Sequence, residues 1–338
     1  TLIPMSGAAS LDNDGLKAVL AGSSASMKML IDKNRTGVAG NAENYDIRQL
    51  FQLLYTKWMG PRADASVFDR ILVELKKSAD YSEVTSQKML EVFDYLYGSA
   101  SGYHFIMTGD LPADSVLPLC NLWIGSLPSG ARDYRLLQKV IQPLTADSLV
   151  YEYSEKEKAT VTLTWENGLD AEDSAFSLYR RMLMCDLQKG VISSRLRQVL
   201  REEMGITYSV GVVASAAVHP VPMWRSGLVC SCLPANTDTL LSEVKNQLQQ
   251  MADDPELFRS TLEDVKRNLL NQHALHLQQN TWWCGYIRNL IYNHEPDWTF
   301  ADHYEQIVLS ITPQQVADDI RQMLASPCSI KIQSNRQQ

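Results

Sequence analysis

An internal repeat constrains the fold of this chain more than any single motif does. The segment VFDRILVELKK at 67–77 aligns with LFRSTLEDVKR at 257–267, with phenylalanine, leucine and lysine at the same relative positions. Both segments have the apolar spacing of an amphipathic helix. In each copy another helix precedes the matched one and a strand follows later, so we predict a duplicated α+β domain.

The second copy has the signals of a whole domain. Strands are predicted at 148–154, 159–165, 206–215, 226–233 and 329–334, and a helical region is predicted over 173–204. Strands and helices that do not strictly alternate favour an antiparallel sheet with helices packed on one face. We therefore predict an α+β fold of tandem related domains, each an antiparallel sheet with helices on one face.

The first copy is expected to be truncated at its N-terminus. It has the matched helices and a strand predicted at 103–109, but Thr1 aligns with the middle of the second copy. Turn-forming residues are frequent between the copies. We predict a truncated domain at 1–130, a linker at 131–147 and a second domain at 148–338, in a fragment or processed product of a longer chain.

Charge and hydropathy exclude two classes of function. The formal net charge is -8 over 338 residues, and no block of lysine and arginine offers the footprint of a nucleic-acid-binding protein. No run of about 18 apolar residues occurs, so no membrane span is predicted. We expect neither a nucleic-acid partner nor a membrane span.

The stretch LREEMGITYSVG at 200–211 is predicted to join a helix to a strand. Gly205 stands where a helix C-cap favours the left-handed conformation. Tyr208, Val210 and Val212 then alternate along the predicted strand. Arg201 suits a helix C-terminus on charge alone, and Tyr208 suits a half-buried strand position, so the residues by themselves leave a structural and a functional interpretation open.

Three segments resemble the pitrilysin-type zinc peptidases, the family that includes insulin-degrading enzyme. They are RTGVAGNAENYDIRQLFQLLYTKWMGPRADASVF at 35–68, GYHFIMTGDLPADSVLPLCNLWIGSLPSG at 102–130 and SSRLRQVLREEMGITYSVGV at 193–212. They occur in the family's order. The resemblance implies that this chain is the third and fourth domains of a bacterial four-domain member.

One departure from the family concerns the metal. Active members have the motif H-x-x-E-H, which binds zinc and activates water, and this sequence lacks it. His273 and His276 lie one predicted helical turn apart, but no base or third carboxylate stands at the family's spacing, so a solvated or capping role is favoured. The resemblance implies zinc in the missing N-terminal half of the parent enzyme. We predict no metal ligand and no catalytic residue in this chain.

The resemblance gives Arg201 and Tyr208 a role. In members of the insulin-degrading type, an arginine and a tyrosine with this separation bind the substrate backbone near the scissile bond. Both side chains donate hydrogen bonds, which an oxyanion requires. Arg197, one turn earlier, fits a solvated helix face. The aromatic segment 280–292 favours core packing, with a peptide-binding wall or an interface to the N-terminal half as the alternatives.

The predicted function is the non-metal C-terminal half of a pitrilysin-like zinc metalloendopeptidase. It closes the catalytic chamber and docks a peptide or unfolded polypeptide, with its own N-terminal half as partner, and it is inactive alone. The alternative is a non-catalytic peptide-binding or assembly subunit of the same fold. The four-domain bacterial resemblance implies a periplasmic location.

Overall fold

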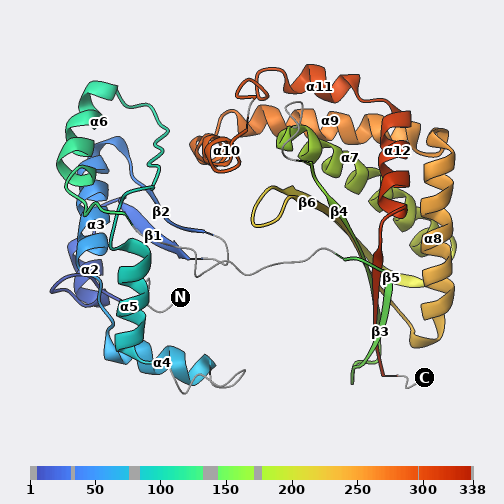
Figure 1. Ribbon diagram of the computed structural model, residues 1–338, viewed down its shortest axis with the longest axis horizontal. Coiled ribbons are helices and arrows are strands. Elements are labelled where there is room, and N and C mark those ends of the chain that lie inside the picture. The colour runs from blue at the N-terminus through green and yellow to red at the C-terminus, as the bar shows by residue number, and fades with distance from the viewer. Residues whose placement is uncertain are drawn as a thin grey trace. The chain divides into compact units, whose positions relative to one another are not determined.

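The computed structural model describes residues 6–31, 35–75, 84–131, 144–170, 177–295 and 297–335. The chain divides into two units, Thr1–Leu137 and Gln138–Gln338 (Figure 1). The predicted domain limits stay predictions, because most of the predicted linker, 132–143, lies outside the described residues.

Unit 1 is mainly helical, with one antiparallel pair of strands. Its described elements are α2 (Asn13–Val19), β1 (Ser26–Ile31), β2 (Thr36–Asn41), η1 (Asn44–Asp46), α3 (Ile47–Met59), α4 (Ala65–Leu75), α5 (Ser86–Tyr97), α6 (Ala113–Leu119) and the π-helix η2 (Cys120–Ile124). Of the two matched segments of the repeat prediction, residues 67–75 fall on α4, and residues 257–267 fall on helices η6 and α9 of unit 2.

The strand predicted at 103–109 is wrong for the described structure. Residues 103–108 form no strand with the described parts of the chain. The rings of Tyr103 and Phe105 instead pack on Trp58, with ring centroids 5.0 and 5.9 Å away. Tyr103 and Phe105 therefore pack into the hydrophobic core of unit 1 and not into a sheet.

Unit 2 contains one five-stranded sheet and a set of helices. Its described elements are β3 (Ser148–Tyr153), β4 (Ala159–Gly168), α7 (Leu178–Leu196), the π-helix η4 (Arg197–Glu203), β5 (Thr207–Ala217), β6 (Met223–Cys232), η5 (Pro234–Asn236), α8 (Thr237–Asp253), η6 (Pro255–Phe258), α9 (Arg259–His276), α10 (Asn280–Tyr292), α11 (Tyr304–Ser310), α12 (Pro313–Leu324) and β7 (Cys328–Ser334). Every strand predicted for this region is present, and α+β is confirmed as the fold class.

The sheet is mixed, which corrects the prediction of an antiparallel sheet. Its strand order is β3-β7-β4-β6-β5, and β3 pairs with β7 in parallel. The short connection 154–158 makes β3 and β4 run in opposite directions, and β7 lies between them antiparallel to β4. A strand inserted into this hairpin must be parallel to one of its two arms.

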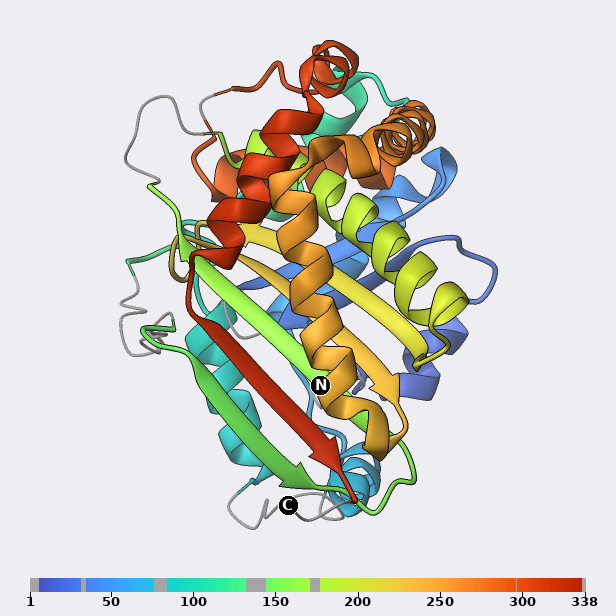
Figure 2. The same cartoon turned by 90° about the vertical axis from the view of Figure 1, so that its right-hand side faces the viewer.

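The helices of unit 2 cover one face of the sheet. Figure 2 shows α8 and α12 in front of the strands. Alternate residues of β4 point into this layer and are fully or almost fully buried: Ala159, Val161, Leu163 and Trp165. The period of two buries one face and leaves threonines on the other. The core therefore lies between the sheet and the helices, as the sequence predicts.

Helices α7 and α9 pack closely against each other at a glycine. A Cβ atom built on Gly190 would lie 2.7 Å from both γ carbons of Val265, a distance that real side chains do not adopt. The close approach fixes α7 over the sheet, and α7 leads directly to the helix-to-strand junction at 200–211.

We expect Gly190→Ala to destabilise the protein. Overpacking costs about 1–3 kcal/mol, against a gain of about 1 kcal/mol from alanine's helix propensity. Thermal melts of Gly190→Ala and of Gly168→Ala, whose Cβ would meet no atom within 4 Å, check this. With Val265→Ala present, Gly190→Ala should become stabilising; a loss of the same size in that background would contradict the steric explanation.

Candidate functional site

The helix-to-strand junction is built by a π-helix that ends at a left-handed glycine. Helix α7 continues into η4, where the amide of Met204 donates to the carbonyl of Val199 (2.9 Å). Gly205 has a φ of 63°, and the next amide, of Ile206, donates to the carbonyl of Leu200 (3.0 Å). The predicted C-cap is confirmed. These bonds fix the direction in which β5 leaves the helix.

Arg201 lies in this last helical turn and is exposed. The residues just before it, Val199 and Leu200, are 5% and 0% exposed and anchor the turn in the core. Within the described residues, the Arg201 guanidinium has no ion pair or hydrogen bond. The helix C-terminus favours a cation here. Its backbone is therefore held rigidly while its side chain is open to solvent.

Tyr208 occupies a β-bulge at the start of β5. Thr207 pairs with Cys232 and Ser209 pairs with Ser231, so Tyr208 is the extra residue. The Thr207 hydroxyl lies 3.0 Å from the carbonyl of Ser209 and 2.8 Å from that of Ser231. A bulge leaves one residue outside the ladder and redirects its side chain.

The bulge corrects the predicted alternation along β5. Val210 and Val212 pack against the core as predicted, but Tyr208 does not, and its side chain is 48% exposed. The ammonium of Lys158 lies 4.4 Å from the centre of its ring. A cation over an aromatic face is attractive and holds the ring. The phenol group is therefore presented at the edge of the sheet, since β5 is an edge strand.

Sequence reasoning missed Lys158. It precedes β4, whose first residue pairs with Cys232, the same residue that pairs with Thr207. Only the strand order β4-β6-β5 brings Lys158 and Tyr208 to one end of the sheet. No sequence pattern near Lys158 or Tyr208 predicts that the two residues lie close together.

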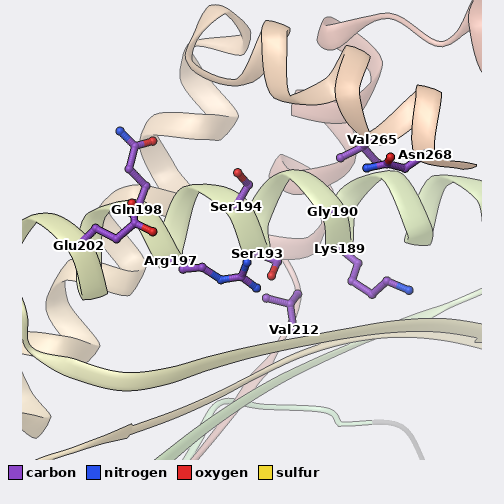
Figure 3. A pocket seen from close by; sticks show the side chains of 10 residues that line it. All are labelled: Lys189, Gly190, Ser193, Ser194, Arg197, Gln198, Glu202, Val212, Val265 and Asn268. Atoms are coloured by element: carbon purple, nitrogen blue, oxygen red, sulfur yellow. The ribbon is translucent and has the colours of Figure 1, made fainter.

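A pocket of about 660 Å³ adjoins the junction, between α7, α9 and β5 (Figure 3). Its lining is mostly polar: Lys189, Gly190, Ser193, Ser194, Arg197, Gln198, Glu202, Val212, Val265 and Asn268. Arg197 is exposed, as predicted, yet it lines this pocket and not an open helix face. No local sequence pattern indicates the pocket, because Val265 and Asn268 of α9 are distant from Arg197 along the chain.

The two histidines of α9 do not fit a metal site. His273 Nε2 lies 3.2 Å from the carbonyl of Ala301, and its ring stacks on Tyr304 with centroids 4.1 Å apart. His276 stacks on Trp282. Burial lowers the pKa of His273, which favours the neutral ring in this packing. Both histidines are half-buried in the last turn of α9 and pack against aromatic rings, which corrects the predicted solvated role in part.

The aromatic segment 280–292 packs partly into the core, in line with the favoured interpretation. Tyr286 and Leu290 are buried, and Trp282 and Trp283 pack against them. Trp282 and Tyr286 stack with centroids 5.1 Å apart. This packing accounts for the aromatic residues without a bound peptide.

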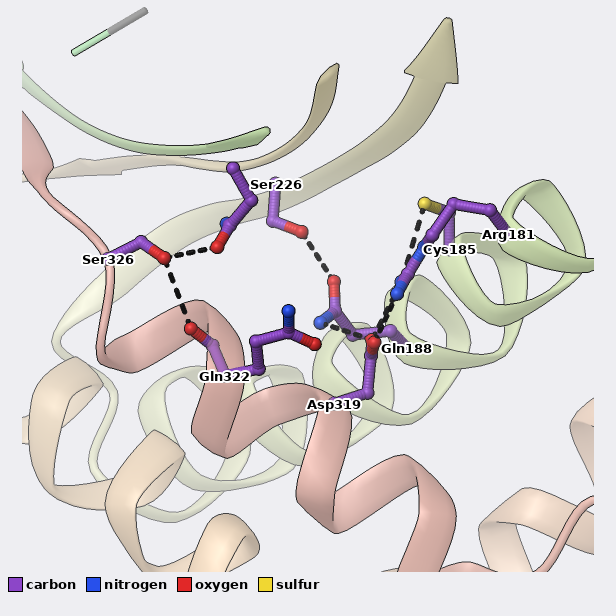
Figure 4. Close-up of polar contacts among 8 residues, drawn as sticks. Arg181, Cys185, Gln188, Ser226, Asp319, Gln322 and Ser326 are labelled. Carbon is purple, nitrogen blue, oxygen red and sulfur yellow. Dashed lines mark hydrogen bonds and ion pairs between the residues drawn. The ribbon is translucent and has the colours of Figure 1, made fainter. Parts of the chain in front are cut away.

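A buried ionic network holds α7 in place (Figure 4). Arg181 forms an ion pair with both carboxylate oxygens of Asp319 on α12, and its guanidinium lies 4.2 Å from the ring centre of Trp224. Gln188 donates to Asp319 (2.9 Å) and accepts from Ser226 on β6. Burial disfavours the charge on Arg181, but Asp319 outweighs it and raises the arginine's pKa.

Comparisons with known proteins agree with this fold. Residues 83–269 match the family described as the peptidase M16 inactive domain. The periplasmic protease PqqL from Escherichia coli superimposes with a TM-score of 0.83 at 17% identity, over 99% of this chain and 40% of PqqL. An M16 inactive domain from Pseudomonas fluorescens gives 0.72 at 16% identity, over 99% of this chain and 87% of that one.

The first half of PqqL, solved separately, also has this fold. It gives a TM-score of 0.68 at 12% identity, over 99% of this chain and 81% of that structure. No curated protein matches the sequence significantly. Because the family match covers more than half of the sequence, the chain belongs to the peptidase M16 inactive domain family. The resemblance to pitrilysin-type peptidases is thereby confirmed, and the chain spans 40% of the length of PqqL.

Proposed function

We propose that this chain is the C-terminal, non-metal half of a pitrilysin-like zinc metalloendopeptidase, which closes the catalytic chamber and docks the peptide substrate. The observation that carries the proposal is the match of residues 83–269 to the M16 inactive domain. The chain is similar to 40% of the length of PqqL, and it is also similar to the first half of PqqL. These two similarities support a partner half that has the same fold. PqqL is periplasmic, which supports a periplasmic location.

In this proposal Arg201 and Tyr208 bind the substrate backbone. Both are exposed, and both are fixed by the backbone around them, one by the π-helix and the other by the bulge. Guanidinium and phenol groups both donate hydrogen bonds at neutral pH. Donors held in advance stabilise a carbonyl oxygen as negative charge develops on it.

Zinc belongs to the other half in this proposal. His273 and His276 are engaged in aromatic packing, and no cluster of three potential ligands exists within the parts of the chain that the structure describes. No described helix is long and apolar enough to cross a membrane. The proposed role of this chain is therefore positioning, with no chemical step of its own.

We expect the isolated chain to cleave no peptide and to gain activity on mixing with an N-terminal half that has the H-x-x-E-H motif. Light scattering after size-exclusion chromatography should show a complex of the two, and a quenched peptide should report cleavage by the mixture alone. Independent elution without cleavage would contradict the proposal. A stable complex without cleavage would favour the non-catalytic peptide-binding or assembly subunit.

The metal content of each sample separates these outcomes. After washing with a chelator, zinc should be found only in the samples that contain the N-terminal half. A tightly held zinc in the isolated chain, with chelator-sensitive cleavage, would place the catalytic centre here instead. An N-terminal half with its motif glutamate replaced by glutamine is the matched control, because it should still associate.

A further inference from the structure

A row of polar side chains runs along one face of α7 and η4 towards the junction. Lys189, Ser193, Arg197 and Arg201 follow each other at intervals of four residues. In an α-helix each such step drifts by about 40° around the axis. A π-helical turn contains more residues than an α-helical turn, so each residue of η4 rotates less around the axis. The step from Arg197 to Arg201 therefore rotates in the opposite sense to the drift along α7. The row therefore leads from the pocket to Arg201.

The helix that bears this row is basic, although the chain is acidic. Residues 178–203 contain six arginines and lysines and three acidic residues, while the chain has a net charge of -8. Several of these cations are engaged: Lys189 pairs with Asp186 (2.8 Å), and Arg195 donates to Gln247. Within the described residues, Arg197 has no such partner. Its charge is therefore available to a ligand.

The pocket supplies the other contacts that a small anion needs. In Figure 3 the Arg197 guanidinium lies beside Ser193, between α7 and Val212 of β5. The serine hydroxyl is a donor, and the valine forms an apolar wall. An arginine fork and a hydroxyl match the two oxygens of a carboxylate.

One acidic group limits the choice of anion. Glu202 also lines the pocket, and it repels further negative charge. A phosphate with two charges, or a polyanion such as nucleic acid, would meet this repulsion in a chain that is already acidic. Among the described residues that line the pocket, Arg197 is a cation without a partner, Lys189 is already paired and Glu202 is negative. This combination of charges favours a ligand with a single negative charge, such as a carboxylate.

We infer that Arg197 and Ser193 form a carboxylate subsite for the peptide that Arg201 and Tyr208 hold. The subsite takes an acidic side chain or the C-terminal carboxylate of that peptide, and so selects among substrates. This inference rests on the proposed docking function. It adds a specificity element that lies one helical turn from Arg201.

Fluorescence anisotropy with three peptides of one sequence tests the inference on the full 338-residue chain. The first peptide is neutral, with glutamine and a C-terminal amide; the second has glutamate in place of that glutamine; the third has a free C-terminal carboxylate. At low salt, one or both acidic peptides should bind about fivefold more tightly than the neutral one. The preference should fall at high salt.

Two variants of the pocket should change the preference for acidic peptides in opposite directions. Arg197→Gln should abolish the preference for the acidic peptides and leave the affinity of the neutral peptide unchanged, and Arg197→Lys should retain part of it. Glu202→Gln should enlarge the preference, because it removes the repulsion. Both positions are exposed, so thermal melts should stay unchanged.

The outcomes separate the subsite from the docking function. Equal binding of all three peptides, with Arg197→Gln silent, would overturn the subsite and leave the docking function standing. A neutral peptide whose binding is unaffected by Arg201→Gln would overturn the proposed backbone contact of Arg201. If none of the three peptides binds, both proposals fail for this chain.

Discussion

Tyr208→Phe should lower kcat about 100-fold in the enzyme reconstituted from this chain and its N-terminal half. The substitution removes the phenol donor and keeps the ring, so the cation–π contact with Lys158 should survive. A donor to a developing oxyanion contributes about 3 kcal/mol in the transition state. Because the contact strengthens only as charge develops, KM should change little.

The matched control for this substitution is Tyr151→Phe. Tyr151 lies on β3, the opposite edge of the same sheet, and its side chain is 48% exposed, like that of Tyr208. It should keep full activity. Arg201→Lys keeps the positive charge but loses the planar fork, so it should also lower kcat. Wild-type kcat in Tyr208→Phe, with an unchanged melting temperature, would show that the phenol does not contact the substrate.

Local signals explain which parts of the junction could be predicted. Gly205 marks the helix end because its left-handed conformation is a local property. Val210 and Val212 reveal the buried face of β5 by their spacing. Such features depend on residues close together in sequence.

The features that place the candidate site depend on distant residues. The bulge at Tyr208 arises from pairing of Thr207 and Ser209 with β6, and the pocket needs α9 beside α7. The π-turn of η4 has the same residue pattern as an ordinary helix end. For the same reason the parallel pair β3–β7 could not be predicted, since β7 comes from the far end of unit 2.

Loss of the buried pair between Arg181 and Asp319 should have the largest effect on stability. The two residues are 138 positions apart, and their side chains are 14% and 5% exposed. Asp319→Ala leaves Arg181 charged and buried without its partner, which costs about 3–5 kcal/mol. For a unit of this size the melting temperature should fall by about 10 °C.

The neighbouring residue on α12 provides the control. Asp318 pairs with Arg321, and both of these side chains are at least half exposed. Asp318→Ala should therefore cost less than about 1 kcal/mol. Urea unfolding of both variants measures the difference directly. Equal losses in Asp318→Ala and Asp319→Ala would show that burial does not make the Asp319 pair special.

A double replacement tests whether the pair itself is favourable or only costly to break. Arg181→Met with Asp319→Leu removes both charges, and apolar side chains of similar size often restore the stability of a buried pair. Here the recovery should be incomplete. Gln188, which is fully buried, loses Asp319 as the acceptor of its amide group, and an unsatisfied buried donor costs about 1–3 kcal/mol. Adding Gln188→Leu would leave the Ser226 hydroxyl without its acceptor as well, so the triple variant should gain little over the double one. Full recovery in the double variant would instead show that the amide finds another partner, and that Asp319 matters to α7 only as the counter-charge of Arg181.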